Sequence, residues 1–257
     1  MRSSAVIVIP CYNEARRLQI GTFQEFVCDG HALRFLFVND GSTDETAIVL
    51  ERLQKCDPQR FAIHDLPRNV GKAEAVRAGL LRAFDAGSDY VGYWDADLAT
   101  PLGAIPAFCD LLDARPDLLI VFGARVRLLG RAIERRAIRH YLGRVFATAA
   151  SLVLGLAIYD TQCGAKLLRV STEIKSLFRC PFVTRWLFDV EIIARLIQSR
   201  WGMNLPPVDE IIYEFPLDEW RDIAGSKVKP SDFVKSFFGL IMIYWKYFRL
   251  RSPTTTG

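Results

Sequence analysis

The sequence predicts an α/β fold with a mainly parallel central sheet and helices on both faces. Short, mainly apolar runs alternate with helical stretches, which is typical of strands buried in a parallel sheet. Each run ends in a polar or glycine-containing loop, and α/β proteins bind ligands at the carboxyl ends of their strands. With 257 residues, 51% of them hydrophobic, the chain can bury a sizeable core within one domain.

The apolar runs predict five strands. The first run consists of alanine, valine and isoleucine, which favours a strand buried on both faces. Helical patterns lie between the runs, and Thr43 or Asp44 is suited to cap the helix that follows the second strand. The predicted strands are Ala5–Ile9, Leu33–Val38, Ala62–Leu66, Tyr90–Trp94 and Leu118–Phe122.

Two carboxylates, Asp95 and Asp97, follow the fourth strand. Because strand side chains alternate between faces, residues at i and i+2 should project to the same side. Like charges on one side repel each other unless a cation lies between them. A divalent ion shared with a phosphate is the simplest occupant, since Mg²⁺ takes one or two carboxylates plus phosphate oxygens. The alternative is a solvated Asp-x-Asp turn.

Polar residues also follow the other strands, and a parallel sheet would bring them to one edge. Asp40 can accept hydrogen bonds from a ribose or a base, or can serve only as a turn residue. Gly71 and Lys72 offer backbone N–H groups and a cation to a phosphate. The Walker A glycine is missing, because Leu66 stands in its place, and there is no GxGxxG pattern for a dinucleotide. In chain order these residues are Asn13, Glu14, Asp40, Gly71, Lys72, Asp95 and Asp97.

Composition narrows the class of protein. A net charge of +4 does not indicate nucleic-acid binding. The six cysteines have no metal-like spacing and indicate buried thiols in a reducing compartment. No apolar run is long enough to span a membrane, and the first residues run directly into a strand, so we expect neither a span nor a signal peptide.

Four motifs, taken in order, resemble glycosyltransferase family 2. Members of that family have the GT-A fold and transfer a sugar from a nucleotide-sugar with inversion. Three later motifs resemble the dolichyl-phosphate glucosyltransferase branch of the family. The four shared motifs are Pro10–Glu14, Asn39–Asp44, Asn69–Lys72 and Asp95–Asp97. The three later motifs are Asp160–Lys166, Arg185–Glu191 and Gly225–Lys227.

The resemblance implies a division of the chain and a set of site residues. It implies a GT-A catalytic domain at 1–230, a C-terminal amphipathic helix at 231–251 and a tail at 252–257. It places Mg²⁺ or Mn²⁺ on Asp95 and Asp97, with Asp97 essential to catalysis. The residues it assigns to the nucleotide-sugar are Pro10, Tyr12, Glu14, Asp40, Lys72, Asp95, Gln162 and Lys227.

The acceptor determines whether a base is needed. Transfer to a hydroxyl normally requires one. A phosphate monoester, with a second pKa of about 6, is already mostly dianionic at neutral pH. The enzyme must then hold two phosphates together, and arginine forks suit that task. The resemblance favours Arg125, Arg136 and Arg139 of the arginine-rich segment as phosphate contacts; the alternative is a solvated basic helix face.

Two carboxylates lie in the apolar helix predicted at Trp186–Leu196. Residues at i and i+2 do not share a helix face, so we expect one of Asp189 and Glu191 to point inward and the other outward. The resemblance places Asp189 near the acceptor and leaves open whether it transfers a proton.

Two apolar segments are candidates for contact with a membrane. Val145–Tyr159 contains no charge, and Phe233–Phe248 is rich in aromatic residues and flanked by lysines and arginines. Both suit interfacial helices, or alternatively a buried helix or a dimer interface.

These features lead to one preferred function and several alternatives. We expect a metal-dependent inverting glycosyltransferase that moves glucose from UDP-glucose to a polyprenyl phosphate, peripheral on the cytoplasmic membrane face. Within the same fold, a hydroxyl acceptor or a GDP-mannose donor is the alternative. A non-catalytic nucleotide-sugar-binding protein is the alternative of another class, and a nucleotidyltransferase would leave the later motifs unexplained.

Overall fold

The computed structural model describes residues 3–134, 137–223 and 230–249. Its centre is a seven-stranded sheet in the order β3-β2-β1-β4-β7-β5-β8. Strand β7 is antiparallel to both neighbours, and the other neighbouring pairs are parallel, so the prediction of a mainly parallel sheet is confirmed. The strands are β1 (Ser4–Cys11), β2 (Ala32–Asn39), β3 (Phe61–Asp65), β4 (Tyr90–Trp94), β5 (Ile120–Ala124), β7 (Ala165–Arg169) and β8 (Ile212–Pro216). A small parallel sheet pairs β6 (Ala132–Glu134) with β9 (Glu219–Arg221).

All five predicted strands are present, with ends within two residues of the prediction. Strands β7 and β8 of the main sheet are not predicted by the sequence pattern. Strand β7 carries Lys166 at its second position, which interrupts the apolar run that would indicate a buried strand. The lysine is buried all the same, because the site described below supplies its partners.

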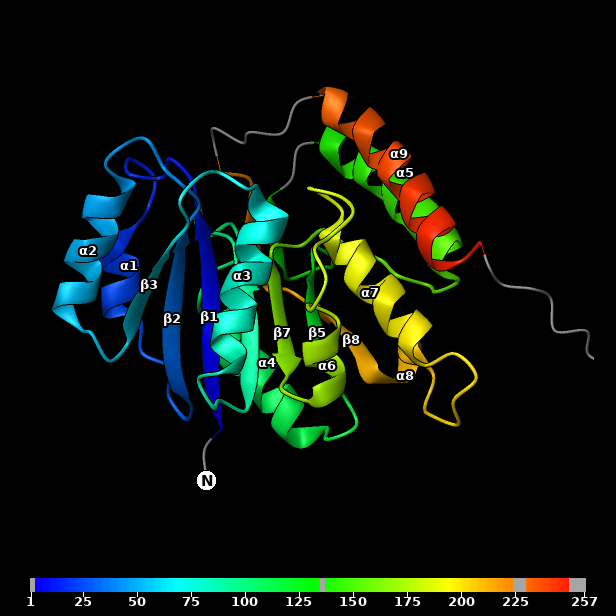
Figure 1. Ribbon diagram of the computed structural model, residues 1–257, viewed down its shortest axis with the longest axis horizontal. Helices are drawn as coiled ribbons and strands as arrows, with labels where there is room; N and C mark the ends of the chain where they lie inside the picture. Colours follow the sequence, from blue (N-terminus) through cyan, green and yellow to red (C-terminus); the bar gives the residue numbers. More distant parts are fainter. Residues whose placement is uncertain (1–2, 135–136, 224–229, 250–257) are drawn as a thin grey trace, which may run out of the picture.

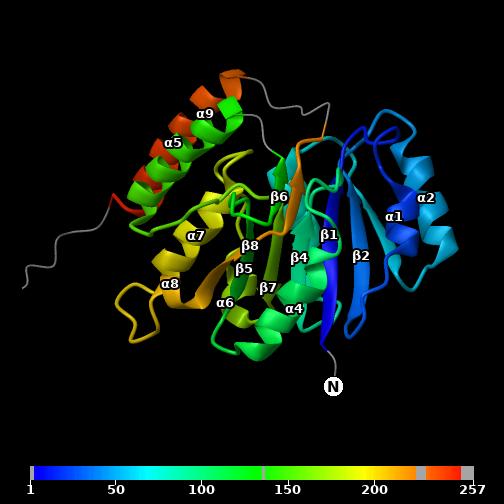
Figure 2. The same ribbon diagram turned by 180° about the vertical axis from the view of Figure 1, so that it is seen from behind.

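Helices cover both faces of the sheet (Figures 1 and 2), as the sequence predicted. Alternation along β1 explains the two layers: Val6 and Val8 join the core under α3 and α7, whereas Ile7 and Ile9 join the core under α1, α2 and α4. The helices are α1 (Ile20–Glu25), α2 (Thr46–Cys56), α3 (Lys72–Phe84), α4 (Ala104–Ala114), α5 (Ala137–Leu154), α6 (Thr172–Ser176), α7 (Phe188–Ser199), α8 (Val208–Ile211) and α9 (Pro230–Tyr247).

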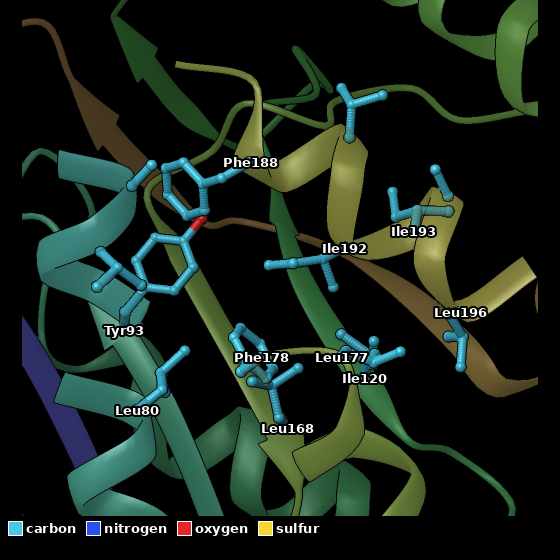
Figure 3. Close-up of a cluster of buried hydrophobic side chains, with 14 of the residues drawn as sticks. Leu80, Tyr93, Ile120, Leu168, Leu177, Phe178, Phe188, Ile192, Ile193 and Leu196 are labelled. Carbon is cyan, nitrogen blue, oxygen red and sulfur yellow. The ribbon is translucent and has the colours of Figure 1, made fainter. Parts of the chain in front are cut away.

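Helix α7 is held by one of the two hydrophobic cores (Figure 3). Its apolar side chains, among them Phe188 and Ile192, face Tyr93 of β4 and Phe178. The rings of Tyr93 and Phe188 lie 5.4 Å apart at an interplanar angle of 51°. This packing fixes the start of α7 against the end of β4, where the polar motifs gather.

Helices α5 and α9 lie side by side, apart from the sheet, and both contact α7 (Figures 1 and 2). Gly239 allows α9 to approach closely, because a Cβ atom there would lie 2.8 Å from Leu187 Cδ1. The structure therefore has a C-terminal helix, as predicted, although it begins at Pro230. Among the described residues, no helix is both long and apolar enough to cross a membrane.

The cysteines form no disulfide. The interpretation that they are buried thiols is right for Cys11, Cys109 and Cys163 and wrong for Cys56 and Cys180, which are exposed.

Candidate active site

Two adjoining cavities lie at the carboxyl edge of the parallel strands. The first, of about 470 Å³, is bounded by the ends of β1 and β2, and we call it the strand-side cavity. The second, of about 300 Å³, extends to α5 and α9, and we call it the helix-side cavity. Both are lined by Lys72, Asp95, Asp97 and Trp186, so these four residues mark the junction of the two cavities.

Asp95 and Asp97 lie together, as predicted, but a turn and not the alternation of strand side chains brings them together. Strand β4 ends at Trp94, and residues 95–98 form a turn in which Leu98 N donates to Asp95 O at 3.1 Å. The alternation of strand side chains therefore does not apply. Leu98 has a positive φ of 54°, a strained conformation for a bulky residue that is characteristic of functional turns.

Cations already face both carboxylates. Lys72 Nζ lies 2.6 Å from Asp95 Oδ1, and Arg17 Nη2 lies 3.5 Å from Asp97 Oδ2. Burial and the neighbouring charge of Asp95 raise the pKa of Asp97. Burial disfavours the Lys72 ammonium, but the charges of Asp95 and Asp189 outweigh it and raise the pKa of Lys72. Lys72 therefore stays charged at the junction of the two cavities, beside Asp95 and Asp97.

The donor set fits a hard divalent cation. The described residues contain no cluster of three or more acidic, histidine or cysteine side chains able to hold a metal by themselves. Mg²⁺ and Mn²⁺ accept carboxylate oxygens, and Mg²⁺ commonly takes only one or two of them and completes its shell with phosphate and water. Asp95 and Asp97 could therefore hold the ion together with a bound diphosphate.

Gly164 is required by the position of the Asp95 carboxylate. Asp95 N donates to Gly164 O at 2.9 Å, and a Cβ atom on Gly164 would lie 2.0 Å from Asp95 Oδ2. We expect Gly164→Ala to displace this carboxylate and reduce metal-dependent activity at least about tenfold, the scale seen when groups that orient metal ligands are lost. Metal titration of activity measures the effect. Gly103→Ala is the matched control, because nothing lies within 4 Å of a Cβ there; equal behaviour of the two variants would contradict the expectation.

Asp40 holds the loop that precedes α3. Its carboxylate accepts hydrogen bonds from Val70 N at 2.7 Å and Gly71 N at 3.0 Å. Burial raises the pKa of Asp40, against the lowering effect of those bonds and of nearby Arg185. Asp40 lines the strand-side cavity, as predicted for a nucleotide contact, but two of its acceptor positions are occupied by the loop.

The strand-side cavity also contains the predicted nucleotide contacts at and just after the end of β1. Pro10, Tyr12 and Glu14 all line it. Glu14 is buried and lies 3.4 Å from Arg17, which faces Asp97 on its other side. Residues from five stretches of the chain, at 10–17, 40, 69–75, 95–97 and 185–186, are thus brought to one cavity.

The predicted phosphate ligand Arg125 is engaged by a carboxylate. Its Nε and Nη2 donate to Asp160 at 2.6 and 2.8 Å. Burial alone would lower the pKa of Arg125, but the ion pair raises it. Glu214 in turn accepts hydrogen bonds from Tyr159 N and Asp160 N. Arg125 lines the helix-side cavity, and Asp160 fixes its guanidinium there.

Asp189 lies in a buried polar network. Lys166 Nζ is 2.7 Å from Asp189 Oδ1, and the Tyr93 hydroxyl donates to the same oxygen. Lys166 also donates to the carbonyl oxygens of Thr161 at 3.0 Å and Cys163 at 2.8 Å. The network joins the start of α7 to β4, β7 and the loop between residues 160 and 164, and Asp189 lines the helix-side cavity.

The prediction that only one carboxylate of this helix points inward is wrong. Asp189 is 5% exposed and Glu191 is fully buried. Glu191 pairs with Arg195 at 2.7 Å and accepts a hydrogen bond from Tyr247 of α9 at 2.7 Å. Helix α7 is covered by the sheet on one side and by α5 and α9 on another, so two different faces are inside the protein.

Three predicted residues cannot be placed. Arg136 and Lys227 lie outside the described residues, and Arg139 lies in α5, where the structure does not describe its side chain. Two other arginines of that segment have structural partners: Arg131 donates to Pro216 O, and Arg144 donates to Tyr159 O and stacks on its ring.

Sequence reasoning assigned no role to three residues that line the cavities. Arg185 lines the strand-side cavity near Gly71, and Trp186 lies at the junction. Both belong to a motif that carried the resemblance, and that was the available signal. Thr161 lines the helix-side cavity beside Gln162, which was predicted.

Comparison with known proteins identifies the family. A model of the family described as "Glycosyl transferase family 2" matches residues 6–175. The chain belongs to this family. It is therefore a glycosyltransferase, and the prediction made from its motifs is confirmed.

This family 2 glycosyltransferase is similar to three dolichyl-phosphate beta-glucosyltransferases. Two are from Trichomonas vaginalis; one is 30% identical over 92% of this chain and 69% of its own length, and the other is 32% identical over 92% and 72%. The third, from Saccharomyces cerevisiae, is 29% identical over 94% of this chain and 74% of its own length. The names of these relatives thus agree with the branch that the later motifs suggested.

Solved structures share the fold of this glycosyltransferase. Glucosyl-3-phosphoglycerate synthase from Mycobacterium tuberculosis, solved with UDP, matches 95% of this chain and 80% of its own at a TM-score of 0.64 and 18% identity. The mannosyltransferase PcManGT from Pyrobaculum calidifontis, solved with GDP-Man and Mn²⁺, matches 96% of this chain and 64% of its own at a TM-score of 0.57 and 17% identity. The GT-A fold prediction is confirmed.

Proposed function

We propose that this chain transfers glucose from UDP-glucose to a polyprenyl phosphate, with Mg²⁺ or Mn²⁺ on Asp95 and Asp97. The names of its relatives support glucose and a polyprenyl phosphate of the dolichyl type. The strand-side cavity would hold the nucleoside diphosphate against Asp40 and Lys72. The helix-side cavity would hold the sugar and the acceptor phosphate.

The charges at the junction suit departure of a nucleoside diphosphate. Lys72 offers a cation to the phosphates, and a bound divalent ion would stabilise the charge that develops on the leaving group. Asp95 and Lys72 attract each other at 2.6 Å, so a bound metal and diphosphate would compete for both partners of this ion pair. Their separation on binding would expose the ammonium to phosphate oxygens.

The surroundings of Asp189 support a phosphate acceptor. A general base must have an oxygen available to the proton that it removes. Asp189 Oδ1 already pairs with Lys166 and accepts a hydrogen bond from the Tyr93 hydroxyl. Because a phosphate monoester is already an anionic nucleophile, the reaction requires no base, and Asp189 would position neighbouring groups.

The main support for the proposal is that the helix-side cavity extends from the carboxylate pair to α5 and α9. It runs from the Asp95–Asp97 pair to Gly143, Phe146 and Ala147 of α5 and to Ser236 of α9. Both helices also expose large apolar side chains, which suits a membrane surface. The exposed apolar residues are Tyr141, Leu142, Val145 and Leu152 of α5 and Phe237, Phe238, Ile241, Met242, Tyr244 and Trp245 of α9. A lipid phosphate could thus reach the carboxylates from headgroup level.

Transfer of radiolabel from UDP-glucose to polyprenyl phosphate, with Mg²⁺ or Mn²⁺, tests the proposal. We expect an acid-labile, lipid-soluble product. Product from GDP-mannose alone would overturn the donor. Metal-dependent hydrolysis of UDP-glucose without lipid product would overturn the acceptor and favour a hydroxyl group.

We also propose that α5 and α9 bind the membrane surface peripherally, with Lys246 and Arg249 meeting anionic headgroups. Replacing two exposed residues, Phe238 and Trp245, by glutamate should reduce partitioning into anionic vesicles at least about tenfold, because each buried aromatic ring contributes about 1.5–3 kcal/mol. Vesicle co-sedimentation measures the change. Ile48→Glu, on exposed Ile48 of α2, is the control and should leave partitioning unchanged. If both variants partition like the unaltered protein, these helices do not bind the membrane.

A further inference from the structure

We propose that the Thr161 hydroxyl, together with the Gln162 amide, recognises hydroxyl groups of the transferred sugar. The proposal rests on the proposed function, because it takes a nucleotide-sugar as the donor. It goes further by naming the residues that select the sugar. These residues are neutral hydrogen-bonding groups, unlike the metal and the cations that hold the phosphates.

Both side chains carry a buried polar atom that has no hydrogen-bond partner among the described residues. Thr161 is 1% exposed, and its Oγ1 has no hydrogen bond within the described part of the chain. Gln162 Nε2 is inaccessible to solvent and equally without a partner there. Native proteins satisfy most buried polar groups, so such atoms indicate a function or a missing partner. Both residues line the helix-side cavity, where a ligand can supply that partner.

Hydrogen bonds with buried side chains hold the backbone around Thr161 and Gln162 in place. Lys166 Nζ donates to Thr161 O at 3.0 Å and to Cys163 O at 2.8 Å. Gln162 N donates to Asp160 Oδ1 at 3.2 Å. The loop is therefore held in place while its side-chain donors stay available. Sites that recognise ligand hydroxyls are preorganised in this way.

The position and chemistry of the pair fit a sugar better than a phosphate. Neither group is charged; a threonine hydroxyl both donates and accepts, and an amide nitrogen donates. Two residues further along, Gly164 contacts the Asp95 carboxylate. A sugar attached to a diphosphate at the Asp95–Asp97 pair would thus lie beside the loop. Hydroxyl groups are what such a sugar offers.

Thr161→Val tests the proposal, because valine keeps the shape and removes the hydroxyl. We expect affinity for UDP-glucose, measured by calorimetry with Mn²⁺ and no acceptor, to fall about three- to tenfold. Affinity for UDP should not change, and Thr161→Ser should retain sugar binding. We also expect the variant without ligand to melt about 2–4 °C higher, since an unpaired buried hydroxyl is gone.

Thr46→Val is the matched control for stability. The Thr46 hydroxyl is also fully buried, but it accepts from Glu14 N at 2.8 Å and bonds Asp44, so its loss should lower the melting temperature. If the melting temperature rises in Thr161→Val and falls in Thr46→Val, the Thr161 hydroxyl is available to a ligand, whereas the Thr46 hydroxyl stabilises the fold.

The outcomes distinguish the two proposals. Suppose that unaltered protein binds both UDP and UDP-glucose. If Thr161→Val then changes neither affinity, Thr161 does not recognise the sugar. The same conclusion holds if the variant weakens both affinities equally and lowers the melting temperature. If unaltered protein binds no uridine nucleotide, the proposed donor is wrong, and GDP with GDP-mannose becomes the pair on which the variant is judged. UDP-glucose analogues that each lack one hydroxyl then identify the group: the analogue on which Thr161→Val has no further effect lacks Thr161's partner.

Discussion

Asp97→Asn is expected to reduce metal-dependent sugar transfer by at least about 100-fold, comparable to the loss of one group that stabilises developing charge. Asn retains the size of the side chain but removes the negative charge that would hold the divalent ion. The fold should tolerate the change, because Asp97 repels Asp95 and the ion pair between Asp97 and Arg17 is 3.5 Å long. Turnover as a function of Mn²⁺ concentration, with a melting curve, measures both effects.

The control for Asp97→Asn is Asp29→Asn, which removes an exposed carboxylate from a turn remote from the site. It should keep full activity. Undiminished metal-dependent turnover of the Asp97→Asn protein would show that the metal and the leaving group are held elsewhere, and would overturn the assignment of the carboxylate pair.

Lys166→Met should lower the free energy of unfolding by about 3–5 kcal/mol, the usual cost of leaving one partner of a buried ion pair without its counter-charge. Lys166 is 1% exposed and Asp189 is 5% exposed, so water cannot replace the ammonium. The variant also leaves the carbonyl oxygens of Thr161 and Cys163 without a donor. Denaturant unfolding of the two proteins measures the difference.

Two further variants test the cause of that loss. Lys55→Met, at an exposed lysine of α2, should change stability by no more than about 0.5 kcal/mol. Adding Asp189→Leu to Lys166→Met removes the stranded carboxylate and should restore part of the loss. A loss below about 1 kcal/mol in the single variant would show that the Lys166–Asp189 pair does not stabilise the fold.

Local sequence was sufficient to predict most of the sheet. The apolar run of β1, and that of β2 apart from Arg34, is bounded by polar loops, and this pattern is independent of the rest of the chain. It failed for β7, because Lys166 belongs in a buried strand only when Asp189, distant in sequence, is there to pair with it. A one-dimensional pattern contains no information about such a partner.

The sequence by itself determined which polar residues would gather at the site, because parallel strands bring their carboxyl ends to one edge. Glu14, Asp40, Lys72 and Asp97 are all found there. Only the tertiary structure decided which of these groups are already engaged. Lys72 faces Asp95, Arg125 faces Asp160, and both carboxylates at the start of α7 are buried. These pairings depend on the distance between atoms that belong to different loops, and the order of residues along the chain does not fix that distance.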